Sequence, residues 1–156
     1  KFRLIKPALE IIRSDFLSRE IHTGELARVS GVSETYIKRL FCERFGMPPK
    51  RYIIQMKINH AAELLRFGEY KISDVALMSG YSDVYFFSRQ FKKYMGITPN
   101  DYLNLKRITK ARALLDEGLS VTDTSVQLGY SSCSYFIRLF KEQYGMTPYK
   151  YKNRLS

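Results

Sequence analysis

Hydrophobic residues recur at helical spacing along almost the whole chain, and no segment keeps the two-residue alternation of a strand. This pattern predicts an all-α protein. The first helix is expected over about residues 5–17, with Leu9, Ile12 and Phe16 on its buried side. Three pairs of helices follow, and each pair begins with a short helix, expected over about 23–29, 72–78 and 121–128. Longer helices over about 50–67 and 100–117 connect the pairs, and a last short helix is expected over about 148–155.

One local pattern occurs three times. The segment GVSETYIKRLF at 31–41 recurs as GYSDVYFFSRQF at 80–91 and as GYSSCSYFIRLF at 129–140. Repetition at an even spacing indicates an array of similar units rather than one isolated motif. The prediction is therefore three tandem helix-turn-helix subdomains joined by long linker helices. Their bounds are 1–49 for the first helix and first unit, 50–68 for a linker, 69–99 for the second unit, 100–118 for a second linker, and 119–156 for the third unit and C-terminal helix.

Turn and cap residues support this division. A glycine ends each short helix, where it can take the left-handed conformation that a helix C-terminus needs, at Gly31, Gly80 and Gly129. Hydroxyl side chains are expected to cap the helix starts, on the short helices at Thr23 and Ser120 and on the second helices at Ser33, Ser82 and Ser131. Each unit is thus predicted to be a helix, a tight glycine turn and a second helix.

The second helix of each unit is expected to have one buried face and one exposed, variable face. In the first copy Ile37, Leu40 and Phe41 share the apolar stripe, and phenylalanines occupy matching places in the other copies. The opposite face holds one arginine in every copy, while its neighbours differ. Arginine can bind phosphate or pair with guanine in a major groove, and a neighbour such as Ile137 can contact a thymine methyl. The side chains predicted to read bases are Thr35, Lys38, Arg39, Tyr85, Ser88, Arg89, Ser134, Ile137 and Arg138.

The net charge points to a polyanionic partner. The chain has 26 Lys and Arg against 15 Asp and Glu, a formal charge of +11 and a pI of about 9.7. An ordinary solvated face is the alternative for any single basic helix, and three copies with the same turn argue against it. The residues predicted to contact DNA phosphates are Ser33, Arg44, Lys50, Arg51, Ser82, Lys92, Lys93, Ser131, Lys141 and Lys150.

Several classes of function are not expected. No apolar run approaches a membrane span, and no signal-peptide core occurs, so we expect a cytoplasmic protein with no membrane partner. Cys42 and Cys133 are expected to be inert thiols, and His22 and His60 ordinary polar residues, because no zinc or disulfide spacing occurs. Because no catalytic constellation or phosphate-cradling glycine loop is present, neither an enzyme nor a metal or cofactor is expected. The first residue is lysine, which suggests a piece of a longer protein.

The order of helix, glycine turn and aromatic-rich second helix ending in F-K-x-x-x-G-x-T-P resembles the DNA-binding domain of the AraC/XylS family of bacterial transcription regulators. Residues 1–104 resemble that domain from end to end, and 105–156 resemble another copy of its second unit. The resemblance implies an all-α fold whose recognition helices each enter one major groove, and a separate sensing or dimerising domain elsewhere in the parent protein. Three units depart from the usual two.

Two further differences between the copies have consequences. Thr124 and Ser125 stand in the third copy where the others have apolar pairs, so its core is expected to be weaker. Cys42 stands in the first copy where the others have lysine, which removes one predicted phosphate contact.

These observations predict sequence-specific binding to double-stranded promoter DNA and regulation of transcription, in the bacterial cytoplasm and on the nucleoid. A linker of eighteen residues spans about 27 Å, so with side-chain reach three units are expected to cover about three helical turns, or roughly 30 base pairs. The alternative is a helical docking module for a protein such as RNA polymerase, with weak or degenerate DNA affinity. RNA binding is a weaker alternative, because no sheet-borne aromatic motif occurs. The sequence does not specify the operator, the sign of regulation, the effector or the oligomeric state.

Overall fold

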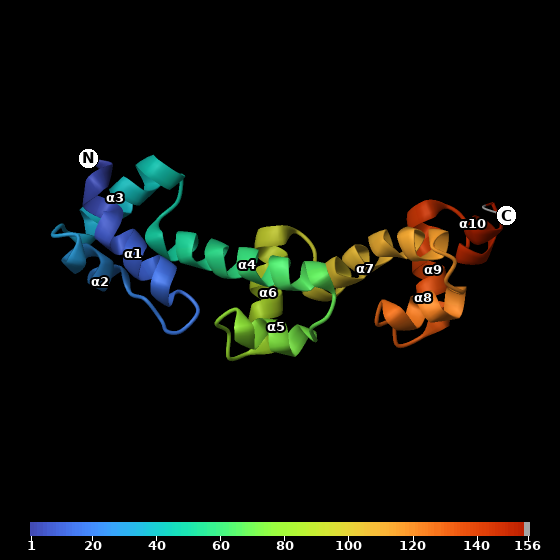
Figure 1. Ribbon diagram of the computed structural model, residues 1–156. Coiled ribbons are helices and arrows are strands. Elements are labelled where there is room, and N and C mark those ends of the chain that lie inside the picture. Colours follow the sequence, from blue (N-terminus) through green and yellow to red (C-terminus); the bar gives the residue numbers. More distant parts are fainter. Residues whose placement is uncertain (155–156) are drawn as a thin grey trace. The chain divides into compact units, whose positions relative to one another are not determined.

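A computed structural model describes residues 1–154. Within them the chain forms α-helices and one short 3-10 helix, with no strand (Figure 1). The all-α prediction is therefore confirmed. The elements are η1 (Phe2–Ile5), α1 (Lys6–Asp15), α2 (Thr23–Val29), α3 (Glu34–Phe45), α4 (Pro49–Phe67), α5 (Ile72–Met78), α6 (Val84–Met95), α7 (Pro99–Asp116), α8 (Val121–Gln127), α9 (Cys133–Tyr144) and α10 (Pro148–Asn153).

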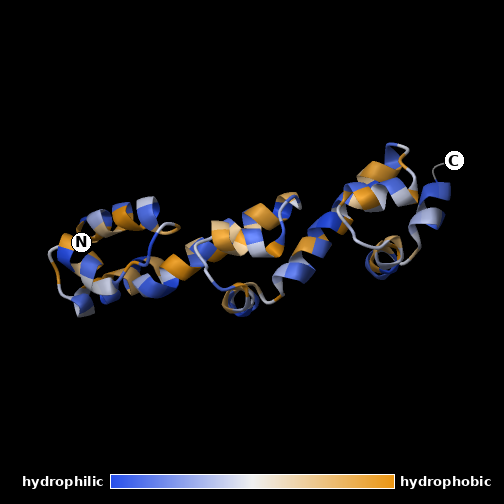
Figure 2. Ribbon diagram, turned by 90° about the horizontal axis from the view of Figure 1, so that it is seen from below, coloured by the Kyte–Doolittle hydropathy of each residue, from blue (hydrophilic) through white to orange (hydrophobic). Residues whose placement is uncertain are grey.

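The helices are grouped in two compact units. The first unit comprises 1–61 and 73–96, and the second comprises 62–72 and the chain from 97 onward. The first unit therefore contains two helix-turn-helix pairs, α2–α3 and α5–α6, with most of α4. The second contains the pair α8–α9, together with α7 and α10. Hydrophobic and hydrophilic residues occur together along the helices, as expected for amphipathic helices that pack through one side (Figure 2).

The core around α3 in the first unit is built from residues that the sequence pattern marked as apolar. Ile12 of α1, Leu26 of α2 and Phe41 of α3 are fully buried and belong to one hydrophobic cluster. Burying a side chain of this size contributes about 1.5–3 kcal/mol each. Leu9 and Phe16, expected to be buried, are half-buried and pack at the margin of this cluster. Because α3 packs into this cluster through one side, the cluster determines which side of α3 faces the solvent.

The second unit has an aromatic core. Phe136 and Phe140 of α9 are fully buried against Ile108 of α7. The Phe140 ring lies 4.8 Å from that of Tyr144 and 5.7 Å from that of Tyr151. The Tyr151 hydroxyl donates to Asp116 Oδ1 at 2.8 Å, and this bond fastens α10 to the end of α7.

The polar substitutions of the third copy lie inside this unit. Thr124 and Ser125 of α8 are buried, and the Thr124 hydroxyl has no hydrogen-bond partner. A buried hydroxyl without a partner costs about 1–3 kcal/mol. The hydroxyls of Ser30 in the first copy and Ser79 in the second are likewise buried without a partner, so the weaker third core stays a prediction.

The helix ends confirm some predicted caps and correct others. The three turn glycines are left-handed, with φ of 66°, 85° and 87° for Gly31, Gly80 and Gly129. The Ser33 hydroxyl caps α3 by accepting from the Tyr36 amide at 3.1 Å, and Ser120 caps α8 in the same way. The caps predicted at Ser82, Ser131 and Thr23 are wrong.

The corrected caps follow from loop length. Copies two and three have one more residue than copy one between the turn glycine and the second helix, so the capping position moves from Ser82 to Asp83 and from Ser131 to Ser132. Thr23 is already the first residue of α2, after an N-cap, His22, whose side chain makes no capping bond. The first predicted helix is also divided into η1 and α1, with Pro7 in the first turn of α1. The last helix ends at Asn153, and its predicted end at 155 lies outside the described residues.

Candidate nucleic-acid interface

The second helix of each pair presents a polar face because its opposite face is held in a core. The stripe of α3 is fully buried, and so are Phe87 and Phe91 of α6 and Phe136 and Phe140 of α9. These anchors fix the rotation of each helix about its axis. Of the side chains predicted to read bases, all except Ser88 and Ile137 are exposed as a result: Thr35, Lys38, Arg39, Tyr85, Arg89, Ser134 and Arg138.

Two of the predicted base-reading side chains are at the edge of this face. Ser88 is half-buried on α6. Ile137 is half-buried as well and packs against the aromatic core of the second unit. Part of the Ile137 side chain is therefore committed to the fold, and of the nine residues these two are the least accessible to a ligand.

The recurring arginine has a different environment in the first copy. Arg39 Nε donates to Glu43 Oε1 at 3.0 Å along α3, and Glu43 is also paired with Lys1. The hydrogen bonds from Lys1 and Arg39 lower the pKa of the Glu43 carboxyl, so this carboxylate stays charged at neutral pH. Glu43 is a residue that the sequence reasoning missed, although its i, i+4 spacing from Arg39 indicates such a pair.

In the other two copies the arginine lies over an aromatic ring. The Arg89 guanidinium carbon is 6.0 Å from the Phe86 ring centroid, and that of Arg138 is 5.1 Å from the Tyr135 centroid. No ion pair of the described residues includes either arginine. An aromatic ring can steady a guanidinium through its face while leaving the in-plane N–H donors available. α6 and α9 therefore present arginine in a form suited to bind an acceptor.

α6 carries two exposed aromatic side chains beside its arginine. Tyr85 is 75% exposed and Phe86 is 45% exposed. Phe86 was not among the predicted site residues, since in the run Phe86–Phe87 the sequence does not show which ring is inside. The exposed faces of α6 and α9 differ here, because Ser134 and Tyr135 occupy the matching places.

The predicted phosphate contacts all lie on the surface. Each is exposed, and three of the cations are near aromatic rings: Arg44 lies 5.3 Å from the Phe45 centroid, and Arg51 and Lys93 each lie 6.0 Å from the Tyr94 centroid. Because Asp83 and Ser132 cap their helices, the hydroxyls of Ser82 and Ser131 are not used as caps. The complete set is Ser33, Arg44, Lys50, Arg51, Ser82, Lys92, Lys93, Ser131, Lys141 and Lys150.

Over residues 1–154 there is no cluster of three or more His, Cys, Asp or Glu side chains placed to hold a metal ion. In the same part of the chain, none of the helices combines the length and apolarity needed to cross a bilayer.

The paired helices and their exposed, arginine-bearing second members define a tandem helix-turn-helix protein. The model of a helix-turn-helix domain family matches the chain twice, over residues 26–105 and 86–154. These matches cover most of the sequence, and the chain belongs to this AraC-type helix-turn-helix family. It is a DNA-binding module of the kind found in transcription regulators.

Individual relatives agree with this assignment. The transcriptional activator RhaR of Yersinia pseudotuberculosis is 41% identical over 69 residues, which are 44% of this chain and 24% of that protein. The C-terminal domain of the two-component response regulator yesN from Fusobacterium nucleatum is 30% identical, with a TM-score of 0.55 over 61% of this chain and 92% of that domain. An AraC-type regulator from Chromobacterium violaceum shares the fold, with 24% identity and a TM-score of 0.59 over 67% of this chain and 92% of that one. The chain thus spans only about a quarter of the length of the RhaR proteins that it matches.

Proposed function

We propose that the chain binds duplex DNA sequence-specifically through α3, α6 and α9, each placed in a major groove, and that it is the DNA-binding part of a bacterial transcription activator. The observation that carries the proposal is the exposed arginine that recurs at one position of three helices, each anchored from behind by fully buried side chains. A rigid helix with donors on its outer face matches the depth and acceptor pattern of the major groove.

The two family matches support the use of all three units. They overlap over residues 86–105, which include most of α6 and the start of α7. The middle recognition helix therefore belongs to two successive two-unit domains, as the second reader of one and the first reader of the next. With linkers of about 27 Å, three readers would cover about 30 base pairs.

The three readers are not expected to contribute equally. α6 has Arg89 with Lys92 and Lys93 on its exposed side and no acidic residue among them. α3 has Glu43, and α9 has Glu142, at the place of Lys93. Because phosphate contacts supply much of the affinity of such complexes, we expect α6 to bind most strongly. The variable side chains of α3 and α9 would then add length and selectivity to the site.

The experiment is a comparison of Arg89→Ala with Lys93→Ala by fluorescence anisotropy, on a duplex selected from random sequence. Loss of a base-reading arginine is expected to cost about 1–3 kcal/mol on the selected site and to relax the preference at its own base pairs, while loss of a phosphate contact weakens all sequences alike. With on the order of 6–10 phosphates neutralised, affinity is expected to fall about 10³–10⁵-fold between 50 and 200 mM salt. An affinity that is flat across this range, or equal effects of both variants on all sequences, would contradict the proposal.

One observation favours a second role for the second and third units. Val126 of α8 is an exposed apolar side chain, and so is Leu77 at the matching place of α5, whereas Arg28 occupies this place in α2. Exposed apolar side chains on the first helix of a unit, away from the DNA-reading helix, suit contact with another protein such as RNA polymerase. Val126→Lys would then reduce transcription activation without changing operator affinity.

A further inference from the structure

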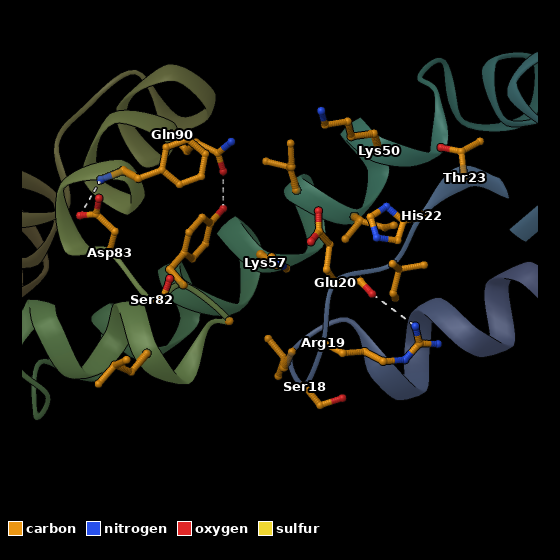
Figure 3. A pocket seen from close by; sticks show the side chains of 18 residues that line it. Ser18, Arg19, Glu20, His22, Thr23, Lys50, Lys57, Ser82, Asp83 and Gln90 are labelled. Atoms are coloured by element: carbon orange, nitrogen blue, oxygen red, sulfur yellow. Dashed lines mark hydrogen bonds between the residues drawn. The ribbon is translucent and has the colours of Figure 1, made fainter. Parts of the chain in front are cut away.

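The first unit contains a cavity that the DNA-binding role does not explain. Its volume is about 790 Å³, within the range of small-molecule sites. It lies beside α4, between the loop that precedes α2 and the turn that joins α5 to α6 (Figure 3). Apolar side chains form much of its wall, among them Leu17, Ile53, Ile54, Leu77 and Phe86. A cavity with this lining can take the body of an organic molecule.

Lys57 supplies a positive charge at this wall without a paired carboxylate. Its Nζ lies 5.5 Å from the Tyr81 ring centroid, and no ion pair of the described residues includes it. Burial lowers the pKa of Lys57, while the charge of nearby Glu20 acts in the opposite direction. In Figure 3 Lys57 lies between Glu20 and the Gln90 side of the cavity. A half-buried ammonium group has lost part of its hydration, so a charge-assisted hydrogen bond to a bound anion would stabilise it.

The other charged groups of the cavity are mostly engaged already. Arg19 is bound to Asp15 at 3.0 Å and to Glu25 at 2.5 Å. The carboxylate of Asp83 accepts from the first amides of α6, at 2.8 Å from the Tyr85 nitrogen. Lys50 and His22 also line the cavity and are exposed. The available charges near Lys57 are therefore Lys50 and Glu20, and the two lysines outnumber the one acid.

In the second unit, too, a cation of the linker helix lies beside the turn glycine and the tyrosine that follows it. Arg107 of α7 takes the place that Lys57 has in α4. A Cβ on Gly80 would lie 3.3 Å from Lys57 Cε, and one on Gly129 would lie 3.2 Å from Arg107 Nη2. Arg107 also lies over the next tyrosine, at 5.9 Å from the Tyr130 centroid. The two linker helices thus use a cation in the same way to pack against the following turn.

The two cations differ in their hydrogen bonds: among the described residues Arg107 bonds to the loop that precedes its helix, and Lys57 does not. Arg107 Nη2 donates to the Gly68 carbonyl at 3.4 Å, and Lys110 Nζ donates to the Phe67 carbonyl at 2.9 Å. In the first unit His60 stands where α7 has Lys110, and its ring packs edge-on against Phe16 at 6.2 Å. No hydrogen bond from Lys57 to the loop is present in the described residues. The first unit thus keeps, beside an open cavity, a cation that contacts the Tyr81 ring but has neither a hydrogen bond nor an ion pair in the described residues.

We propose that this cavity binds a small organic anion, with its carboxylate or sulfonate on Lys57 and its apolar body against Ile53, Leu77 and Phe86. The site is distinct from the exposed faces of α3 and α9, although Lys50 and Ser82 both line it and belong to the proposed phosphate contacts. Binding of such an anion is measured without DNA, so the result does not depend on the proposed function.

The test uses 1-anilinonaphthalene-8-sulfonate, whose fluorescence rises in an apolar site, and N-phenyl-1-naphthylamine, which has the same ring system without the sulfonate. The whole chain is expected to bind one sulfonate probe per molecule, and the neutral probe at least tenfold more weakly. Lys57→Met keeps an unbranched side chain that lacks only the terminal ammonium group, and it is expected to weaken sulfonate binding about tenfold or more. Lys6→Met, which removes an exposed charge of α1 outside the cavity, is the matched control and should leave binding unchanged.

Lys57→Gln provides a second variant should Lys57→Met fold poorly, and circular dichroism is recorded for each protein. Equal binding of both probes, or sulfonate binding that is the same in a folded Lys57 variant as in the parent chain, overturns the proposal. Absence of saturable binding to the parent chain overturns it as well.

Discussion

Replacing Thr124 by valine should stabilise the third helix-turn-helix unit. Thr124 is fully buried on α8, and its hydroxyl has no hydrogen-bond partner. The matching position holds Leu26 in the first copy and Val75 in the second, and both are fully buried. Thr124→Val keeps the β-branched shape and puts a methyl group in place of the unpaired hydroxyl, so it does not open a cavity.

The expected gain follows from the cost of an unsatisfied buried hydroxyl, which is about 1–3 kcal/mol. Since the added methyl group must also fit the site, we expect the free energy of opening to rise by about 1–2 kcal/mol. Denaturant unfolding of the whole chain would report on both compact units together. Native-state hydrogen exchange reports on each unit separately. The amides of α8 and α9 should exchange about five- to thirtyfold more slowly in Thr124→Val than in the parent chain.

Thr122→Val is the matched control. Thr122 is on the same helix and exposed. Its replacement is therefore expected to change the free energy of opening, measured from the same amides, by less than about 0.5 kcal/mol. Unchanged or faster exchange in Thr124→Val would contradict this prediction, because it would mean that the hydroxyl is satisfied in solution and contributes to stability.

Three further predictions concern single contacts. Glu43→Gln releases Arg39 from its carboxylate partner, and DNA affinity measured by anisotropy should rise about three- to tenfold; unchanged affinity would mean that Arg39 does not contact DNA. Gly129→Ala would place a Cβ 3.2 Å from Arg107 at a φ of 87°, whereas Gly145→Ala meets no atom within 4 Å at a φ of 76°. Thermal melting should therefore show a loss of more than about 1 kcal/mol for Gly129→Ala and a smaller loss for Gly145→Ala. Burial raises the pKa of Tyr81 to about 12, so the folded chain keeps a proton that the unfolded chain releases near pH 10. The stability linked to Tyr81 is complete below pH 10 and is lost as pH rises toward 12, and Tyr81→Phe should make the pH dependence of melting less steep in that window. Burial also raises the pKa of Tyr130, so part of the dependence remains.

The sequence predicted the helices well because their register is set by local spacing. Phe87 and Phe91 are one helical turn apart, and so are Phe136 and Phe140, which fixes the buried side of α6 and α9 without knowledge of their partners. The turn glycines were also predictable, since a left-handed C-terminus strongly favours glycine.

Other features depend on the third dimension or on small changes in loop length. One extra loop residue moved the helix cap from Ser82 to Asp83. The contact of Lys57 with Gly80 and Tyr81 joins segments that are distant in the sequence, and no local pattern indicates it. The pair of Arg39 and Glu43 is local, and i, i+4 spacing is the signal that would have found it.

The reading of DNA by α3, α6 and α9 can be tested by hydroxyl-radical footprinting on a duplex selected by the whole chain, with the parent chain compared with Arg39→Ala, Arg89→Ala and Arg138→Ala. Three DNA-reading helices should protect about 30 base pairs on one face of the duplex, and each variant should lose protection over a different third of that length. A footprint that is the same for all four proteins, or no protected segment at all, would contradict the claim that these arginine-bearing helices read DNA.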